Sequence, residues 1–311
     1  MRTSRYLIAC LPIISFFMMN SQNEKKGGES PDIEYQIDRP GKPEEWKCTD
    51  CHELLTGMNY IHSPAGESCE NCHQIDQAQH PEINTSGLFL AEDVPGLCYI
   101  CHDALKTEIE TVQLVHQAMN EKKQCMNCHS PHASQERKLL NKGEIDVCLN
   151  CHYKVINTND RKITNIKELL TKGQVIHPII ETDGCIICHK PHASNFNNLL
   201  VKSFPTEEYI PAKRENFELC WECHDSDLML ASKTITSTKF RNGDKNLHFT
   251  HMNGEKARNC SMCHDVHASV NEHLIAEKVS FGNWELPLNY SANDNGGSCF
   301  PGCHGKSEYS R

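Results

Sequence analysis

The amino-acid sequence predicts a mainly α-helical fold with extensive loops and little conventional apolar core. Only 38% of its 311 residues are hydrophobic and 7% are aromatic, which is little material for a core. Long runs of alternating apolar and polar residues, which would indicate strands, are absent. The third observation is that 18 of the 19 cysteines fall into nine close pairs spread over residues 48–303. Most of the remaining chain therefore connects one cysteine pair to the next.

Every cysteine pair is followed at once by a histidine. Eight pairs have the form CxxCH and the ninth, at residues 299–304, is CxxxCH. CxxCH is the attachment signature of haem c, in which two thiols bond to the porphyrin and the histidine binds its iron. A disulfide framework or a zinc ribbon would not need that histidine. The sequence predicts nine covalently attached haems c, held by Cys48, Cys51, Cys69, Cys72, Cys98, Cys101, Cys125, Cys128, Cys148, Cys151, Cys185, Cys188, Cys220, Cys223, Cys260, Cys263, Cys299 and Cys303, with His52, His73, His102, His129, His152, His189, His224, His264 and His304 as proximal iron ligands.

The spacing within a motif suits this chemistry. Two cysteines three residues apart lie about one helical turn apart, so both thiols face one edge of a porphyrin. The ninth motif keeps both thiols on one side, but Pro301 and Gly302 disfavour a regular turn there.

Ten further histidines are candidates for the second, distal iron ligand. They are His62, His80, His116, His132, His177, His192, His248, His251, His267 and His273. Four of them precede a CxxCH motif and four follow one. This arrangement divides residues 48–311 into a leading haem at 48–52 and four two-haem units, at about 62–102, 116–152, 177–224 and 251–304.

A histidine three residues after a proximal ligand lies on the same side of that haem, so it must bind another one. We expect His132, His192 and His267 to bind the haems of Cys148, Cys220 and Cys299, and His80 to bind that of Cys98. His62, His116, His177 and His251 are expected to fold over the haem of the motif that directly follows each of them. The first haem has no obvious local partner. His248 or His273, from this chain or a neighbouring molecule, and Met58 are its candidates; an exposed or hydrogen-bonded position is the alternative for both histidines.

The expected helices are few. Leu105, Ile109, Val112, His116 and Met119 follow the spacing of one apolar helix face, which places His116 on a helix. A shorter helix is expected near residues 163–170. Because so little apolar side-chain material is present, we expect the chain without haem to be largely unfolded.

The N-terminal residues predict export. Arg2 and Arg5 precede an apolar run from Tyr6 to Met19 that is short for a membrane span, so residues 1–22 resemble a signal peptide. A lipidated Cys10 and an uncleaved N-terminal anchor are the alternatives. Residues 23–47 are rich in charge, Gly and Pro and predict a flexible linker. The expected location is the periplasm or the surface of a bacterium.

The chain is acidic, with a formal net charge of −10. This argues against a nucleic-acid partner and favours redox partners with basic patches, as donor and acceptor.

The pattern H-x(6–8)-CxxCH-x-P-H-A-S, then Leu-Leu, then CxxCH resembles the doubled-CxxCH multihaem cytochromes c. It is clearest in residues 125–152, with Pro131-His132 and Leu139-Leu140, and in residues 185–224, with Pro191-His192 and Leu199-Leu200; Val266 replaces the proline in the last copy. The resemblance implies an elongated, haem-packed chain with bis-histidine iron that transfers electrons. A membrane complex and a homopolymer are forms it could take.

Two functions follow from these observations. The first is an exported electron carrier, in which both axial positions of each iron are filled and no residue is catalytic. The alternative is a multihaem oxidoreductase that acts on a small nitrogen or sulfur oxyanion at one open haem, for which the haems of Cys48 and Cys299 are the best candidates.

Overall fold

The computed structural model describes residues 47–76, 80, 87–158 and 161–311. The chain divides into Met1–Trp46 and Lys47–Arg311, and all described residues belong to the second unit. The predicted signal peptide at residues 1–22 and nearly all of the predicted linker at 23–47 lie outside the described residues, so both stay predictions.

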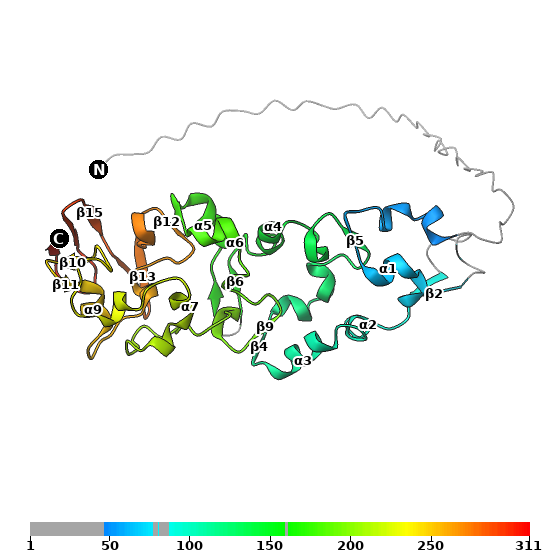
Figure 1. Cartoon of the computed structure of the whole chain (residues 1–311), viewed down its shortest axis with the longest axis horizontal. Coiled ribbons are helices and arrows are strands. Elements are labelled where there is room, and N and C mark those ends of the chain that lie inside the picture. Colours follow the sequence, from blue (N-terminus) through cyan, green and yellow to red (C-terminus); the bar gives the residue numbers. More distant parts are fainter. Residues whose placement is uncertain (1–46, 77–79, 81–86, 159–160) are drawn as a thin grey trace, which may run out of the picture. The chain divides into compact units, whose positions relative to one another are not determined.

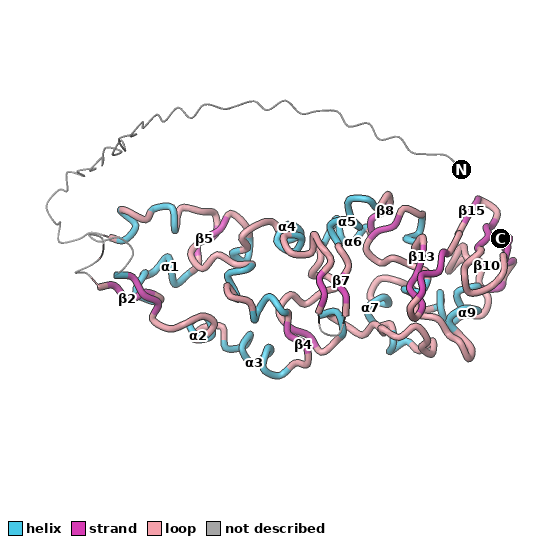
Figure 2. Tube along the Cα trace, turned by 180° about the vertical axis from the view of Figure 1, so that it is seen from behind, coloured by secondary structure: helices cyan, strands magenta, loops and turns pink. Residues whose placement is uncertain are grey.

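The prediction of a mainly α-helical fold was wrong. The described residues form nine α-helices, of which the longest has nine residues, and seventeen strands of two to four residues. Figure 2 shows loops joining these short helices and strands. Strands of two residues are too short to produce an alternating pattern, so alternation of apolar and polar residues could not reveal them.

The elements follow one another as short pieces between the cysteine motifs. The helices are α1 Ser63–Glu67, α2 Gly96–Tyr99, α3 Asp103–Thr111, α4 Glu144–Leu149, α5 Ile166–Lys172, α6 Pro178–Asp183, α7 Glu218–Trp221, α8 Asp227–Leu230 and α9 Leu247–Met252. The strands are β1 Tyr60–Ile61, β2 His73–Ile75, β3 Leu88–Leu90, β4 Leu114–Val115, β5 Ala133–Ser134, β6 Ile156–Asn157, β7 Lys162–Ile163, β8 Val175–Ile176, β9 Ala193–Ser194, β10 Arg241–Asn242, β11 Lys245–Asn246, β12 Ala268–Ser269, β13 Lys278–Phe281, β14 Trp284–Pro287, β15 Ser291–Asn293, β16 Gly296–Cys299 and β17 Ser307–Ser310.

The predicted amphipathic helix is shorter than its apolar spacing suggested. Helix α3 ends at Thr111, and the next residue, Val112, is extended. The N–H of Gln113 donates to the side chain of Asn195, and the chain then enters β4, so His116 does not lie on the helix. The helix expected near residues 163–170 is present as α5, which Asn165 caps by accepting from the N–H of Glu168.

Three pairs of strands join each two-haem unit to the next. β1 pairs with β5, β4 with β9, and β8 with β12, all antiparallel. Figure 1 shows β4 beside β9. In each pair, the first strand directly precedes the upstream histidine of one unit, and the second is the Ala-Ser that follows the downstream histidine of the next. The backbone N–H groups of His62, His116 and His177 donate to the carbonyls of His132, His192 and His267, which ties the histidine segments of neighbouring units together.

The Ala-Ser that follows each of the downstream histidines His132, His192 and His267 has a structural role. Ala133, Ala193 and Ala268 are at most 2% exposed, which leaves no room for a larger side chain. The hydroxyl of Ser194 donates to the carbonyl of Leu200 and accepts from the N–H of Phe196. Ser134 and Ser269 make the same two contacts in their own units. The serine thereby closes the loop that returns the chain to the proximal histidine.

Apolar cores of ordinary kind occur only in the C-terminal part of the described chain. Phe217, Met229 and Met252 form one buried cluster, and Met262, Val279 and Leu288 form a second. Among the described apolar side chains before residue 201, only Ala133, Ala193 and Leu200 are buried.

Candidate haem sites

The cysteine motifs have the turn geometry that the sequence predicted. In seven of them the histidine N–H donates to the carbonyl of the first cysteine over 2.9–3.1 Å, as in a helix: His52, His102, His129, His152, His189, His224 and His264. Such a turn brings both thiols to one side. The ninth motif differs, as expected from Pro301 and Gly302: Cys299 ends strand β16, and the His304 N–H points to the carbonyl of Pro301 at 3.4 Å.

Each of the nine motif histidines faces one other histidine. The ring centroids of the nine pairs are 5.9–6.4 Å apart. The pairs are His52 with His80, His62 with His102, His73 with His132, His116 with His152, His129 with His192, His177 with His224, His189 with His267, His248 with His264, and His251 with His304.

This spacing fits a haem iron between the two rings. Two metal–nitrogen bonds of about 2.0 Å, with ~1.1 Å more from each nitrogen to its ring centre, separate two axial imidazoles by about 6.2 Å. The pair His189–His267 meets that value with its ring planes only 6° apart. Among the described residues, no group of three or more His, Cys, Asp or Glu side chains could hold a bare metal ion. The donor set thus suits a haem bound through two cysteines and two histidines.

The pairing we predicted from the sequence was wrong, although nine of the ten candidate histidines do face a motif histidine. Each upstream histidine faces the second motif of its unit, not the one that directly follows: His62, His116, His177 and His251 face His102, His152, His224 and His304. Each downstream histidine faces the first motif of the preceding unit: His132, His192 and His267 face His73, His129 and His189.

The leading motif and the fourth unit take their facing histidines from other positions. His80 faces His52 of the leading motif, not His102 of the Cys98 motif, so the first motif does have a partner from this chain. The fourth unit uses His248 from its own helix α9 opposite His264. Neither His248 nor Met58 is needed at the first motif.

His273, the tenth candidate, has an exposed side chain and no motif histidine opposite it in the described structure. It contributes its backbone instead, since its carbonyl accepts from Nδ1 of His264 at 2.9 Å. In the two preceding units, the backbone carbonyls of Lys138 and Asn198 accept in the same way from Nδ1 of His129 and His189. Lys138, Asn198 and His273 all have a positive φ. The position does not require a histidine.

Backbone carbonyls orient several of these imidazoles. Nδ1 of His62 and of His116 lies 2.9 Å from the carbonyls of Pro131 and Pro191. A hydrogen bond from Nδ1–H leaves Nε2 free to bind iron and fixes the ring orientation. These carbonyls were not expected from the sequence, although the proline that precedes the downstream histidine marks two of them.

Burial favours the neutral, metal-binding form of several of the facing imidazoles. It lowers the pKa of His248 to about 4, with His264 and His251 adding to the effect. Burial also lowers the pKa of His116, His152, His189 and His267.

Attachment sites that are consecutive in the sequence are neighbours in space. The Cys148 thiol interacts with that of Cys185, and Cys220 with Cys260. The same holds for every step along the series, through Cys48–Cys69, Cys72–Cys98, Cys98–Cys125, Cys128–Cys151, Cys148–Cys185, Cys188–Cys220, Cys220–Cys260 and Cys263–Cys299. Each motif but the last thus has a thiol close enough to a thiol of the next motif for one to influence the pKa of the other.

Comparison with known proteins agrees with this chemistry. A family model described as the doubled CXXCH motif matches residues 62–107, 116–156 and 177–229. The chain is 26% identical over 150 residues to the cytochrome c-type protein NrfB of Escherichia coli, a match that covers 43% of this chain and 78% of the relative. It is 27% identical over 158 residues to the cytochrome c-type protein NrfH of Wolinella succinogenes, covering 48% and 76%. The chain is thus similar to multihaem c-type cytochromes, and these matches support a protein of that kind.

The same matches support covalently bound haem c. The three matched stretches begin within three of the four two-haem units and cover their motifs, whereas the leading motif and the fourth unit lie outside the family match. No helix within the described residues is long and apolar enough to cross a membrane.

Proposed function

We propose that this chain is a multihaem c-type cytochrome that binds nine haems c, each between two histidines, and transfers electrons along the series between a donor and an acceptor protein outside the cytoplasm. Haem iron supplies the one-electron change between its ferric and ferrous states. The observation that carries the proposal is the set of nine facing histidine pairs, in which every motif histidine has its own partner at 5.9–6.4 Å.

Two histidines per iron leave no axial position for a substrate. The haems of Cys48 and Cys299 were the best candidates for an open site, yet His80 faces His52 and His251 faces His304. No observation therefore favours the alternative of an oxyanion-reducing enzyme. The contact between His52 and His80 also removes the reason for expecting a neighbouring molecule to complete the first site.

The proximity of consecutive motifs supports transfer along the whole series. Electron transfer slows steeply with distance, so attachment sites that neighbour one another at every step favour an unbroken route. The Cys48 motif begins the series and the Cys299 motif ends it, which makes these two the natural points of exchange with other proteins.

The acidic composition supports partners with basic docking surfaces, since opposite charge accelerates encounter in a salt-dependent way. The signal-like sequence at residues 1–22 supports export, which the attachment of haem c also requires. Whether the cytochrome acts alone, in a membrane complex or as a homopolymer is a separate question that native mass spectrometry answers.

The pairing can be tested with His132→Ala. The substitution should open one iron, that of the Cys69–His73 motif, and give one high-spin ferric signal in EPR while the intact mass retains nine haems. His273→Ala is the matched control and should give no such signal, because its exposed side chain faces no motif histidine.

A second step identifies the haem. In a Cys69→Ala, Cys72→Ala background the His132→Ala signal should be absent, whereas in a Cys148→Ala, Cys151→Ala background it should persist. The reverse pattern would restore the pairing expected from the sequence and contradict the structure.

A further inference from the structure

Arg258 lies at the junction of the last two haem sites. Its neighbours Ala257 and Asn259 are only 5% and 3% exposed, and Cys260 follows two residues later. Its backbone N–H donates to the carbonyl of His251 over 2.8 Å. Arg258 is therefore tied to the histidine that faces His304 on one side and to the Cys260 motif on the other.

Two aromatic rings hold the guanidinium in place. Its central carbon lies 4.3 Å from the ring centroid of Tyr209 and 5.5 Å from that of Phe281. The two rings meet edge to face at 6.2 Å. A cation held in this way by aromatic faces is oriented as well as stabilised.

One guanidinium nitrogen lacks an acceptor. Nη1 of Arg258 is buried and has no hydrogen-bond partner in the described structure. An arginine stays protonated, and a buried charged donor without an acceptor is strongly unfavourable. The preferred acceptor of the planar guanidinium is a carboxylate, which it binds through two parallel hydrogen bonds.

The nearby Glu208 does not neutralise Arg258 through any ion pair seen among the described residues, and its carboxylate accepts instead from the N–H of Gly282 at 2.9 Å.

We propose that Arg258 binds a carboxylate of a haem held at one of the two C-terminal motifs, those of His264 and His304, and that its charge raises the reduction potential of that haem. This inference rests on the proposed function, because it requires haems at both motifs. A positive charge nearby favours the reduced iron, which carries one positive charge less. The aromatic pair fixes the guanidinium where an exposed arginine would be free to move into solvent.

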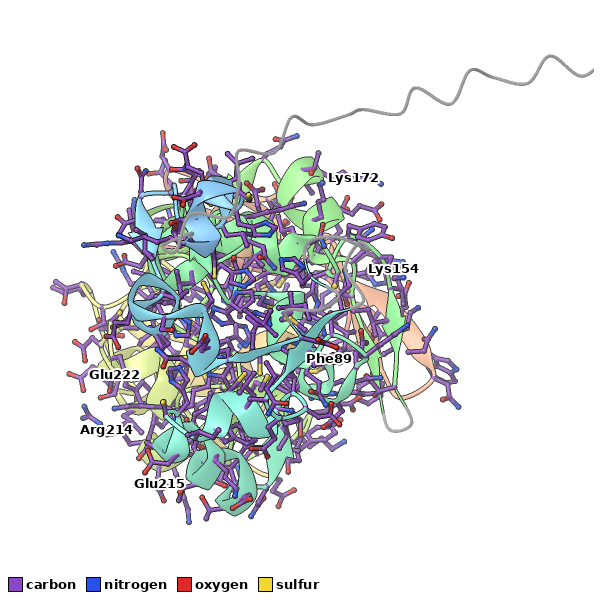
Figure 3. All side chains as sticks on the ribbon, turned by 90° about the vertical axis from the view of Figure 1, so that its right-hand side faces the viewer. Phe89, Lys154, Lys172, Arg214, Glu215 and Glu222 are labelled. Atoms are coloured by element: carbon purple, nitrogen blue, oxygen red, sulfur yellow. The ribbon has the colours of Figure 1, made fainter. Side chains whose placement is uncertain are left out.

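The test is a spectroelectrochemical titration of the nine-haem cytochrome with Arg258→Gln, Arg258→Lys and a control. Arg258→Gln should move one of the nine reduction potentials to a more negative value, and Arg258→Lys, which keeps the charge but not the planar fork, should move it less. Arg214→Gln is the control, since Figure 3 shows Arg214 at the surface of the molecule, and it should leave all nine potentials in place.

Two further variants identify the haem. The shift in reduction potential caused by Arg258→Gln should disappear in one of two backgrounds, Cys260→Ala with Cys263→Ala or Cys299→Ala with Cys303→Ala. The background that abolishes the shift identifies the haem whose carboxylate Arg258 binds. Unchanged potentials in Arg258→Gln with nine haems attached would overturn the inference. If the Arg258→Gln variant lost a haem, the Arg258→Lys variant would be used in its place. Unchanged reduction potentials in Arg258→Lys would then overturn the inference. Failure of the proposed function is distinct, because it would appear in the unmutated cytochrome as fewer than nine haems or as high-spin iron.

Discussion

Residues before and after position 201 differ in how they are held together. Before it, the described chain buries only three apolar side chains, of which two are alanines, and its long-range order comes from two-residue strands between units. After it, two apolar clusters form around Phe217 and Met262, and the chain also forms the three-stranded β15–β16–β17 sheet. The cysteine motifs are thus held in place by short strands before residue 201 and by apolar clusters after it.

The source of the distal histidine explains the contrast. Units one to three each receive a histidine and a strand from the following unit, as His132 and β5 serve His73 and β1. The fourth unit takes both histidines from its own helix α9, where Asn246 caps the helix and Met252 packs into the Phe217 cluster. A unit that supplies its own ligands needs a polypeptide core to position them.

Absence of haem should expose the contrast most strongly. In the chain expressed without haem attachment, we expect amide hydrogens of β1, β4, β5 and β9 to exchange at the rate of an unfolded peptide, because little else orders residues 47–200. Amides of β16 and β17 should keep measurable protection. Hydrogen exchange with mass spectrometry resolves the two parts, and equal protection in both would break the comparison.

The second largest effect is expected from a substitution in the apolar core that follows residue 201. Phe217 is fully buried, so Phe217→Ala should lower the free energy of unfolding of the holo-cytochrome by about 3–5 kcal/mol. Phe89→Ala is the matched control before residue 201; Phe89 is 54% exposed in β3, and its loss should cost less than about 0.5 kcal/mol. Chemical denaturation monitored by circular dichroism measures both. Comparable losses would mean that the earlier residues have an apolar core of their own.

The smallest effect concerns ring orientation. The planes of His177 and His224 lie 65° apart, whereas those of the other pairs lie between 6° and 38° apart. Since the relative orientation of axial imidazoles sets the splitting of the iron d orbitals, we expect the haem of Cys220 to give the low-spin EPR signal with the largest g value. Removing that haem with Cys220→Ala, Cys223→Ala should abolish the signal. Its persistence would show that the rings are parallel in the holo-cytochrome.

The sequence predicted the chemistry of the sites better than their connections. The cysteine motifs and the set of candidate distal histidines follow from residue type and spacing alone. Both His80 and His132 were identified as candidate ligands in this way. The pairing could not be predicted, because it depends on which two-residue strands meet. One signal was available: the apolar dipeptides before His62, His116 and His177 are strand-forming pairs in equivalent places. A second was the alignment of His273 with Lys138 and Asn198, which argued that its imidazole was not required.

The prediction of a mainly α-helical fold was wrong for a related reason. The spacing from Leu105 to Met119 matches a helix, but the hydrogen bond from Gln113 to Asn195 and the pairing of β4 with β9 end that helix at Thr111. Tertiary contacts with the next unit outweighed the local pattern.

The central claim is that this one chain supplies both histidines to each of nine haems c. Intact mass spectrometry combined with quantitative EPR of the purified, oxidised monomer tests it most directly. We expect a mass that corresponds to nine attached haems and iron that is entirely low-spin. Fewer haems, or a stoichiometric high-spin signal in the unmutated monomer, would contradict it.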